Sequence, residues 1–250
     1  MIIDMDDTLV DRESVYIHAQ ETLLGLLRKL DSRVRPKKDV QTLRKVDCEL
    51  VRLHGWKYMY NSTLLVYGLW YFFHEGKSAR RAARLAMVAR PKTLSSELAR
   101  RASARYDAIL KRADPPLLRD ARSVLRRLKK RYVLVLFPSG RRDFQLPVIH
   151  HHGLDKIFDA VLIVQRKDTG SLGRAKELGL RIFRKAYKSQ PRRIVVVGDR
   201  ISTDILPGKK IGAETIWIPG PYYPGTASKG VPDHMIRRLG ELPSILLAKE

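Results

Sequence analysis

Two kinds of hydrophobic pattern divide the chain. From residue 12 to residue 112, apolar side chains recur at helical spacing, which predicts a stretch that is almost entirely helical. From residue 113 onward, short continuous apolar runs alternate with amphipathic segments. Such runs are typical of parallel strands buried on both faces, with helices packed between them. The pattern predicts an α/β domain with a doubly wound parallel sheet, formed by residues 1–11 and 113–250, into which residues 12–112 are inserted as a helical domain.

The inserted stretch is expected to form several helices. Proline near the start and glycine past the end set the bounds of the second helix, and Asn61 is expected to cap the third. The expected helices cover residues 15–30, 36–54, 61–75, 77–90 and 94–112.

The alternating stretch opens with an amphipathic helix over residues 115–130. Strands are then expected at 132–137, 158–164, 193–197 and 215–218, with helices at 143–152, 181–188 and 205–211. Met1–Ile3 supplies the first strand, which is short because strands usually run ~5–6 residues. This shortness raises the question of whether the natural chain starts upstream of Met1.

The charge of the chain is strongly basic. It carries 49 Lys and Arg against 26 Asp and Glu, a formal net charge of +23. Such an excess concentrates anions near the surface and supports non-specific binding of polyanions. Because no RNA- or DNA-binding signature accompanies the charge, a solvated basic surface of the thermophile type is favoured over a dedicated nucleic-acid function.

Cysteine usage and hydropathy bear on the setting of the protein. Cys48 is the single cysteine, so no intrachain disulfide forms, which fits a cytoplasmic protein. The longest apolar run, residues 63–73, has 11 residues, whereas a spanning helix needs ~20. No membrane partner is therefore predicted. The oligomeric state leaves no trace in the sequence.

Two acidic clusters lie where strands are expected to end. Asp4 and Asp6 follow the first strand, and Asp199 follows the apolar run 193–197, with Asp204 five residues later. Parallel α/β sheets place their sites at these strand ends. One carboxylate of the first pair can attack phosphorus, while the other delivers a proton to the leaving oxygen. Oxygen ligands such as Asp199 and Asp204 suit Mg²⁺. Without chemistry, an acid-rich helix start would explain the first cluster, and a turn followed by an Asp-capped helix would explain the second.

Together, the clusters resemble the haloacid dehalogenase (HAD) superfamily. The resemblance rests on Asp4-x-Asp6-Asp7-Thr8-Leu9, on Gly198-Asp199-x4-Asp204-Ile205, and on the segments Phe158–Val161, 211–218 and 232–243. It covers roughly 140 residues on both sides of the insertion, which matches only in position and helical character. The resemblance implies a Rossmann-like core with an all-helical cap and a Mg²⁺-dependent phosphatase activity.

The resemblance also implies roles for individual residues. Asp4 would be the nucleophile and a metal ligand, and Asp6 the general acid and base, with its backbone carbonyl on the metal. Asp199 would be a third ligand, and Asp204 a ligand or a group that orients one. Halide leaves without a proton, and dehalogenases of this family lack the second acid. Asp6 therefore argues for a phosphate ester as substrate.

Two further family motifs are matched less closely. The phosphate-binding hydroxyl position is occupied by Pro138, which has neither hydroxyl nor N–H, so Ser139 and the Gly140 amide are the phosphate-binding candidates. The lysine that neutralises the nucleophile is Lys167 or Lys176, and Lys176 has the spacing closer to that of the family.

The sequence therefore predicts a phosphatase that hydrolyses a small phosphorylated metabolite through an aspartyl-phosphate on Asp4. Two alternatives stay open. The first is a basic nucleic-acid-binding protein on the same fold with weak or lost catalysis, and the second is a phosphatase that acts on nucleic-acid ends.

Overall fold

The computed structural model describes residues 1–54, 61–112, 114–164, 172–186, 194–220 and 232–247. The chain forms two compact units. Unit 1 comprises Met1–Glu13 and Asp114–Glu250, and unit 2 comprises Ser14–Ala113. Each unit has its own hydrophobic core, and the candidate site lies in unit 1.

Unit 1 is built on a six-stranded sheet in which all neighbouring strands are parallel. The strand order is β3-β2-β1-β4-β5-β6. Strands β2 and β3 are added on one side of β1, and β4 to β6 on the other. The order of strands therefore reverses between β1 and β4, and parallel sheets of this kind bind their ligands at such a switch point. The strands are β1 (Ile2–Ile3), β2 (Val135–Leu136), β3 (Ala160–Val161), β4 (Val195–Gly198), β5 (Glu214–Trp217) and β6 (His234–Met235).

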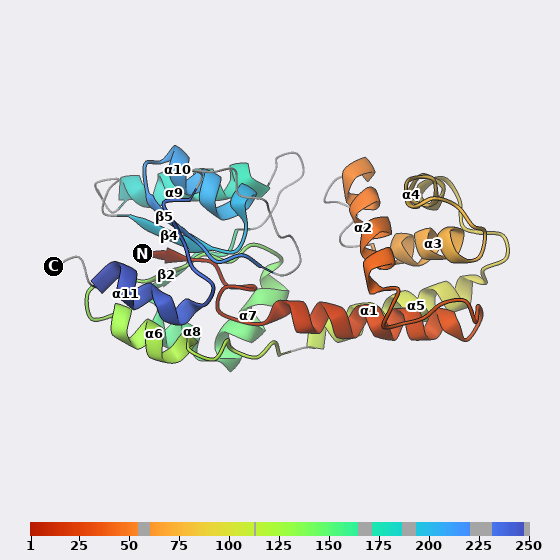
Figure 1. Ribbon diagram of the computed structural model, residues 1–250, viewed down its shortest axis with the longest axis horizontal. Coiled ribbons are helices and arrows are strands. Elements are labelled where there is room, and N and C mark those ends of the chain that lie inside the picture. The colour runs from red at the N-terminus through yellow and green to blue at the C-terminus, as the bar shows by residue number, and fades with distance from the viewer. Residues whose placement is uncertain (55–60, 113, 165–171, 187–193, 221–231, 248–250) are drawn as a thin grey trace. The chain divides into compact units, whose positions relative to one another are not determined.

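Helices cover both faces of this sheet, because successive strand residues point to opposite sides (Figure 1). Ile3 and Val197 pack on the face covered by α6 (Ala121–Leu128), α7 (Arg142–His151), α8 (Leu154–Ile157) and α11 (Leu242–Leu247). Ile2 and Val196 pack on the face covered by α9 (Leu172–Ala186) and α10 (Leu206–Lys210). The predicted doubly wound parallel sheet is confirmed.

Several boundaries differ from the expected ones. The first two apolar runs after the insertion pair only over two residues each, in β2 and β3. The helix expected from Arg181 starts at Leu172, although Gly173 and Gly179 weaken it. Gly179 is useful there, because a Cβ at this position would lie 2.7 Å from the Phe137 ring. Tertiary packing against β2 thus offsets the low helix propensity.

The connection between β4 and β5 and the last strand also differ from the prediction. A π-helical turn, η3 (Ile201–Ile205), precedes α10, where one continuous helix over 205–211 was expected. Strand β6 was not expected, and η4 (Leu239–Glu241) follows it as a short 3₁₀ turn. Part of the strand expected at 193–197, and the end of the helix expected at 181–188, lie outside the described residues.

Unit 2 contains all the helices expected for the insertion: α1 (Arg12–Arg28), whose first two residues belong to unit 1, then α2 (Val40–His54), α3 (Ser62–Phe73), α4 (Ala79–Val88) and α5 (Ser96–Arg112). Helix α2 begins at Val40 rather than Pro36, because the Asp39 carboxylate accepts a hydrogen bond from the Arg35 N–H and holds a turn there. Asn61 takes the N-cap position of α3 as expected, but its side chain makes no capping hydrogen bond.

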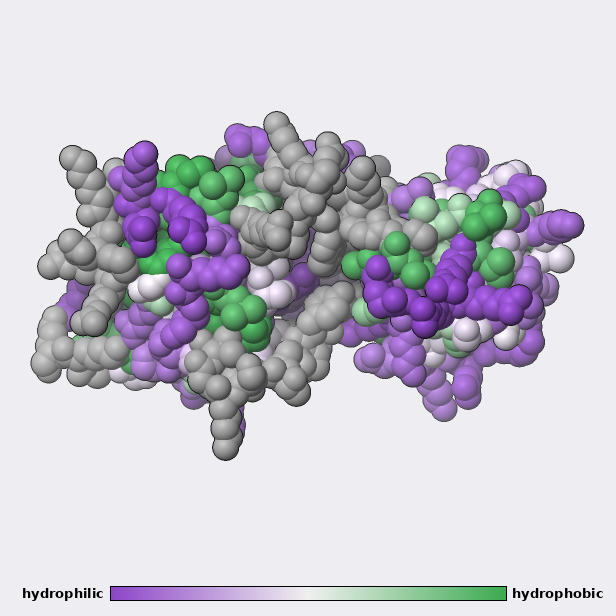
Figure 2. All heavy atoms as spheres, turned by 90° about the horizontal axis from the view of Figure 1, so that it is seen from above, coloured by the Kyte–Doolittle hydropathy of each residue, from purple (hydrophilic) through white to green (hydrophobic). Residues whose placement is uncertain are grey.

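Polar side chains cover much of unit 2 on the face shown in Figure 2, where hydrophilic residues are purple. Apolar residues of all its helices form one core cluster beneath them, with Leu43, Leu69 and Ala83 fully buried. Among the residues described, no helix has both the length and the apolar character needed to cross a membrane.

Asp233 anchors the edge of the sheet through Thr215, which is fully buried. Its Oδ2 accepts hydrogen bonds from the Thr215 N–H and hydroxyl, both at 2.8 Å. Asp233→Ala should lower the free energy of unfolding by about 1–3 kcal/mol, because a buried donor pair loses its acceptor. Lys209→Ala removes only the 2.6 Å ion pair to Asp233 and should cost less than about 1 kcal/mol. Urea unfolding measures both changes in the free energy of unfolding. Equal decreases in the two variants would contradict the stabilising role of the Asp233–Thr215 hydrogen bonds.

Candidate active site

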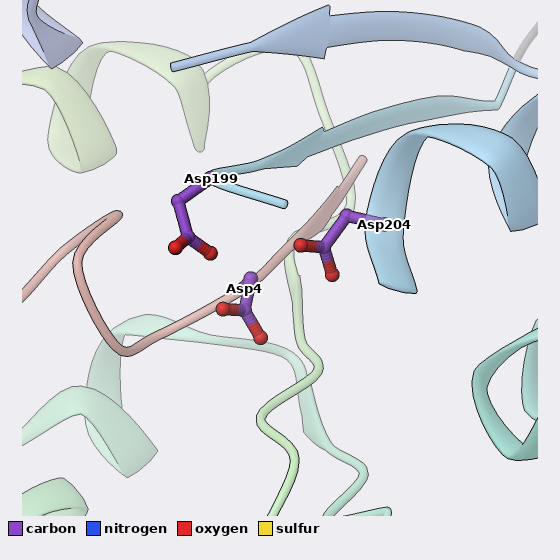
Figure 3. A group of neighbouring side chains, drawn as sticks. All are labelled: Asp4, Asp199 and Asp204. Carbon is purple, nitrogen blue, oxygen red and sulfur yellow. The ribbon is translucent and has the colours of Figure 1, made fainter. Parts of the chain in front are cut away.

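Three carboxylates lie close together at the switch point between β1 and β4, where the strand order reverses. Asp4 follows β1, Asp199 follows β4, and Asp204 lies in η3. Ligand oxygens of the three, one from each, lie within 4.8 Å of one another. Figure 3 shows the side chains directed toward a common centre at the carboxyl ends of the two strands. Folding thus joins Asp4 to a residue, Asp204, that lies 200 positions later in the sequence.

Lys176 of α9 lies against this cluster. Its Nζ donates to Asp4 Oδ1 at 2.6 Å and to Asp204 Oδ1 at 2.5 Å. The Lys176 side chain is only 2% exposed, so both ion pairs are shielded from water. The ammonium also lies 5.7 Å from the centroid of the Phe137 ring, on the strand-end segment that follows β2. Of the two candidate lysines, Lys176 therefore reaches the cluster, and Lys167 lies outside the described residues.

Burial dominates the electrostatics of the cluster. It raises the pKa of Asp4 to about 7, although the Lys176 ammonium opposes the shift. Burial and the charges of Asp204 and Asp4 raise the pKa of Asp199 well above its ordinary range. Burial alone would lower the pKa of Lys176, but the two carboxylates outweigh it and raise that pKa. One ammonium does not neutralise three carboxylates, so the cluster favours a further cation.

Local geometry fixes Asp204 and Asp199. The Asp204 Oδ2 accepts hydrogen bonds from the Arg200 N–H at 3.1 Å and from the Thr203 hydroxyl at 3.3 Å. The backbone carbonyl of Asp199 accepts the indole N–H of Trp217 at 2.7 Å. The π-helical turn η3 presents Asp204, and such turns often occur at functional sites.

The loop after β1 is wound tightly. The N–H groups of Leu9 and Val10 both donate to the Met5 carbonyl, and the Asp7 N–H donates to Val10 O at 2.8 Å. Asp7 adopts a left-handed conformation with φ of 57°, which aspartate tolerates better than most residues. Its carboxylate accepts the Glu13 N–H at 2.8 Å. This loop fixes the position of Asp6 two residues beyond Asp4.

The Asp6 carboxylate is held by two side chains that the sequence analysis missed. Arg12 Nε donates to Asp6 Oδ1 at 3.0 Å, and Gln145 Nε2 donates to Asp6 Oδ2 at 2.9 Å. The same Gln145 amide donates to the Ser139 carbonyl at 3.0 Å. Gln145 is buried, and it links the loop after β1 to the loop after β2. No short-range signal could have paired it with Asp6, which lies 139 residues away.

The loop after β2 holds the predicted phosphate-binding residues. Phe137 N–H donates to Ile3 O, so this loop follows the strand adjacent to β1. Ser139 pairs in parallel with Val164, and the Gly140 N–H donates to Val164 O at 3.0 Å. The Gly140 amide is thus engaged within the sheet in this conformation, rather than presented to an anion as expected. Pro138 is buried, and its carbonyl accepts the Val164 N–H.

The donor set fits a hard divalent cation. Asp4, Asp199 and Asp204 offer only carboxylate oxygens, which Mg²⁺ prefers over nitrogen or sulfur ligands. They form the one group of at least three His, Cys, Asp or Glu side chains with such spacing in the described part of the chain. The clustered negative charge and its burial are the features that a bound cation would compensate.

Comparison with known proteins places this geometry in a family. A family model described as haloacid dehalogenase-like hydrolase matches residues 1–212. The chain belongs to the haloacid dehalogenase-like hydrolases. The predicted family and the prediction of a hydrolase are confirmed, and the acidic cluster occupies the residues on which the resemblance rested.

Individual members of the family are similar at low identity. The chain is 30% identical over 132 residues to the glyceraldehyde 3-phosphate phosphatase of Pyrococcus furiosus, covering 50% of this chain and about half (52%) of that relative. It is 23% identical over 251 residues to the HAD-hydrolase candidate YfnB of Bacillus subtilis, covering 98% of this chain and 94% of YfnB.

Solved structures show the same fold. A magnesium-bound crystal structure of YfnB aligns with a TM-score of 0.58 at 21% identity, over 98% of this chain and 96% of that one. A haloacid dehalogenase-like hydrolase from Xanthomonas campestris aligns with a TM-score of 0.67 at 20% identity, over 99% and 93%.

Gly198 leaves the space that Asp204 fills. A Cβ at this position would lie 2.5 Å from both Cβ and Cγ of Asp204. Because Gly198 is paired with Trp217 in the sheet, Asp204 must shift instead. Because this shift would misplace a predicted ligand, Gly198→Ala should weaken the binding of a divalent cation by roughly tenfold or more. Calorimetric titration with Mn²⁺, in place of Mg²⁺, measures the change.

The matched control is Gly25→Ala in α1, where an added Cβ meets nothing within 4 Å. This variant should bind Mn²⁺ like the wild type and be slightly more stable, because alanine is the better helix former. Unchanged affinity in folded Gly198→Ala would contradict the prediction that Asp204 is a metal ligand.

Proposed function

We propose that the protein is a Mg²⁺-dependent phosphatase that uses Asp4 as a covalent nucleophile. The observation that carries the proposal is the buried cluster of Asp4, Asp199 and Asp204 in a HAD-type sheet, between β1 and β4, with the Lys176 ammonium bonded to Asp4 and Asp204. Relatives named as phosphatases support the choice of a phosphate ester as substrate. The second carboxylate, Asp6, supports it independently, because an alkoxide leaving group requires a proton.

The proposed reaction has two steps. An Asp4 carboxylate oxygen attacks phosphorus, the P–O bond to the leaving group breaks, and Asp6 gives its proton to the departing oxygen. Asp6 then removes a proton from water, which attacks the phosphorus of the aspartyl-phosphate and releases phosphate and free Asp4. Lys176, 2.6 Å from Asp4, balances charge at the nucleophile and on the phosphoryl oxygens during both steps.

Asp4, Asp199 and Asp204 would hold the metal, together with the Asp6 carbonyl that the family resemblance implies. When bound, Mg²⁺ supplies positive charge that lets the phosphoryl oxygens approach these carboxylates. Ser139 is the remaining candidate donor to the phosphate from the loop after β2, since the Gly140 N–H is bonded to Val164.

We infer that the substrate is a small phosphorylated metabolite. The relative from Pyrococcus furiosus is named for a phosphorylated three-carbon aldehyde, which supports this class without identifying the compound. The net charge of +23 is the feature that supports the alternatives, in which the same site removes phosphate from nucleic-acid ends or the protein binds nucleic acid with weak or lost catalysis.

The proposal predicts the fate of Asp4→Asn. An amide oxygen is a poor nucleophile, so release of phosphate from an aryl phosphate with Mg²⁺ should fall by at least about 10³-fold. Chelation of Mg²⁺ from the wild type should abolish the same activity. Asp155→Asn, which alters an exposed aspartate of α8, serves as the control and should be unaffected.

The outcomes separate the proposals. Phosphate release by Asp4→Asn at the wild-type rate would exclude Asp4 as nucleophile. An inactive wild type that binds DNA with a steep dependence on salt would instead support the nucleic-acid-binding alternative.

Gln145 tests the role of Asp6. Gln145→Leu keeps a side chain of similar size but loses the donor to Asp6 Oδ2, so proton transfer becomes misaligned. We expect kcat to fall by about tenfold or more, with little change in KM, in steady-state assays on an aryl phosphate.

The control for this substitution is Gln20→Leu, another buried glutamine, whose Oε1 accepts from Arg44 in unit 2. Gln20→Leu should reduce stability without changing kcat. Equal effects of the two variants on kcat would mean that Gln145 acts only through stability.

A further inference from the structure

A basic pocket lies in unit 1 outside the acidic site. It has a volume of about 310 Å³ and is lined by Arg126, Lys129, Lys130, Lys156 and Ile157. Arg126 lies in the last turn of α6, and Lys129 and Lys130 follow it. Lys156 and Ile157 end the short helix α8. Nothing in the proposed phosphatase mechanism uses these residues.

Local geometry explains why the cations converge. Arg126, Lys129 and Lys130 have i, i+3 and i+4 spacing, which brings side chains to one side of a helix end. Helix α8 is tied alongside, because Lys129 Nζ donates to the Ile157 carbonyl and Arg122 donates to the His152 carbonyl at 2.9 Å. The pocket therefore joins two chain segments held by specific contacts.

Positive charge in this pocket is poorly compensated. Lys129 pairs with Asp159 at 3.3 Å. Arg126, Lys130 and Lys156 are exposed and have no ion pair or side-chain hydrogen bond within the described ranges. Cations stabilise a helix C-terminus, which accounts for Lys130, but not for the addition of Lys156 from a second helix. Like charges gathered in this way repel each other unless an anion joins them.

The pocket and the acidic cluster lie at opposite ends of the strands. Lys129 contacts Asp159, which precedes β3 and accepts the Leu134 N–H just before β2. The pocket thus lies near the amino ends of these strands, whereas Asp4 and Asp199 follow the carboxyl ends of β1 and β4. An anion in the pocket would not occupy the proposed phosphoryl-transfer site.

We propose that this pocket binds a small anion with two or more phosphoryl groups. Three uncompensated cations exceed what a single orthophosphate requires, and the volume is in the range of small-ligand sites. The pocket is shallow, and its five lining residues form a short patch rather than the long basic track that a polymer would need, which favours a small anion. Inorganic polyphosphate and the phosphate chain of a nucleotide share this chemistry.

The test is calorimetric titration with inorganic tripolyphosphate, and separately with a non-hydrolysable nucleoside triphosphate. The pocket variant combines Arg126→Gln, Lys130→Gln and Lys156→Gln. The control variant combines Arg119→Gln, Arg127→Gln and Arg237→Gln, which are exposed cations of unit 1 that do not line the pocket. Both variants lose the same charge, so a general loss of attraction affects them equally.

We expect a single tripolyphosphate site whose affinity falls roughly tenfold or more in the pocket variant and less than about twofold in the control. Tighter binding of the nucleoside triphosphate in a pocket-dependent way would assign the anion to a nucleotide, and equal binding would assign it to polyphosphate. Equal losses in the two variants, or preference for an oligonucleotide over tripolyphosphate, would overturn the proposal.

Phosphatase activity provides an independent readout. None of the substituted residues contacts Asp4, Asp6 or Lys176, so the pocket variant should hydrolyse an aryl phosphate at the wild-type rate. An inactive wild-type protein would refute the proposed phosphatase function and leave the calorimetric result to decide on the pocket.

Discussion

The arrangement of the site depends on one buried ammonium between two carboxylates. Lys176 contacts Asp4 and Asp204 at 2.6 and 2.5 Å, with water almost excluded. Burying these charges is costly, and removing one partner of such a group typically costs about 3–5 kcal/mol. The cluster therefore requires that β1, α9 and η3 approach one another in a single arrangement. A third carboxylate, Asp199, lies 3.7 Å from the Arg200 guanidinium, and three carboxylates beside one buried ammonium leave negative charge that the proposed metal would balance.

The pairing of β1 with β4 brings Asp4 and Asp199 close together. Ile3 is in register with Val197. Asp4, one residue after Ile3, and Asp199, two residues after Val197, therefore lie at the same edge of the sheet. The adjacent pairing of Ile3 with Leu136 brings the loop of Ser139 to the neighbouring position. Gln145 then couples that loop to Asp6, so that the proposed proton donor and the predicted phosphate-binding turn are fixed to each other.

The sequence allowed prediction of those features that have a local signal. Apolar runs and helical periodicity predicted the sheet and the helices, and carboxylates after strands predicted the cluster of Asp4, Asp199 and Asp204. The short strand β6 and the first part of helix α9, before Arg181, were missed, because pairing with β5 and packing of Gly179 on Phe137 are tertiary effects. Gln145 and Arg12 were missed for a similar reason, since an ordinary polar residue on a helix has no signal until its partner is known.

The contrast between the basic chain and its acidic centre has a physical consequence. A phosphate ester approaching three carboxylates is repelled at short range, while a net charge of +23 attracts it at longer range. Screening limits this attraction to about 8–10 Å at physiological salt, so the surface can steer an anion but cannot hold it in the site. Capture must then depend on cations at the centre itself. Lys176 supplies one of them, and because it already pairs with Asp4 and Asp204, the proposed Mg²⁺ would supply the remaining charge.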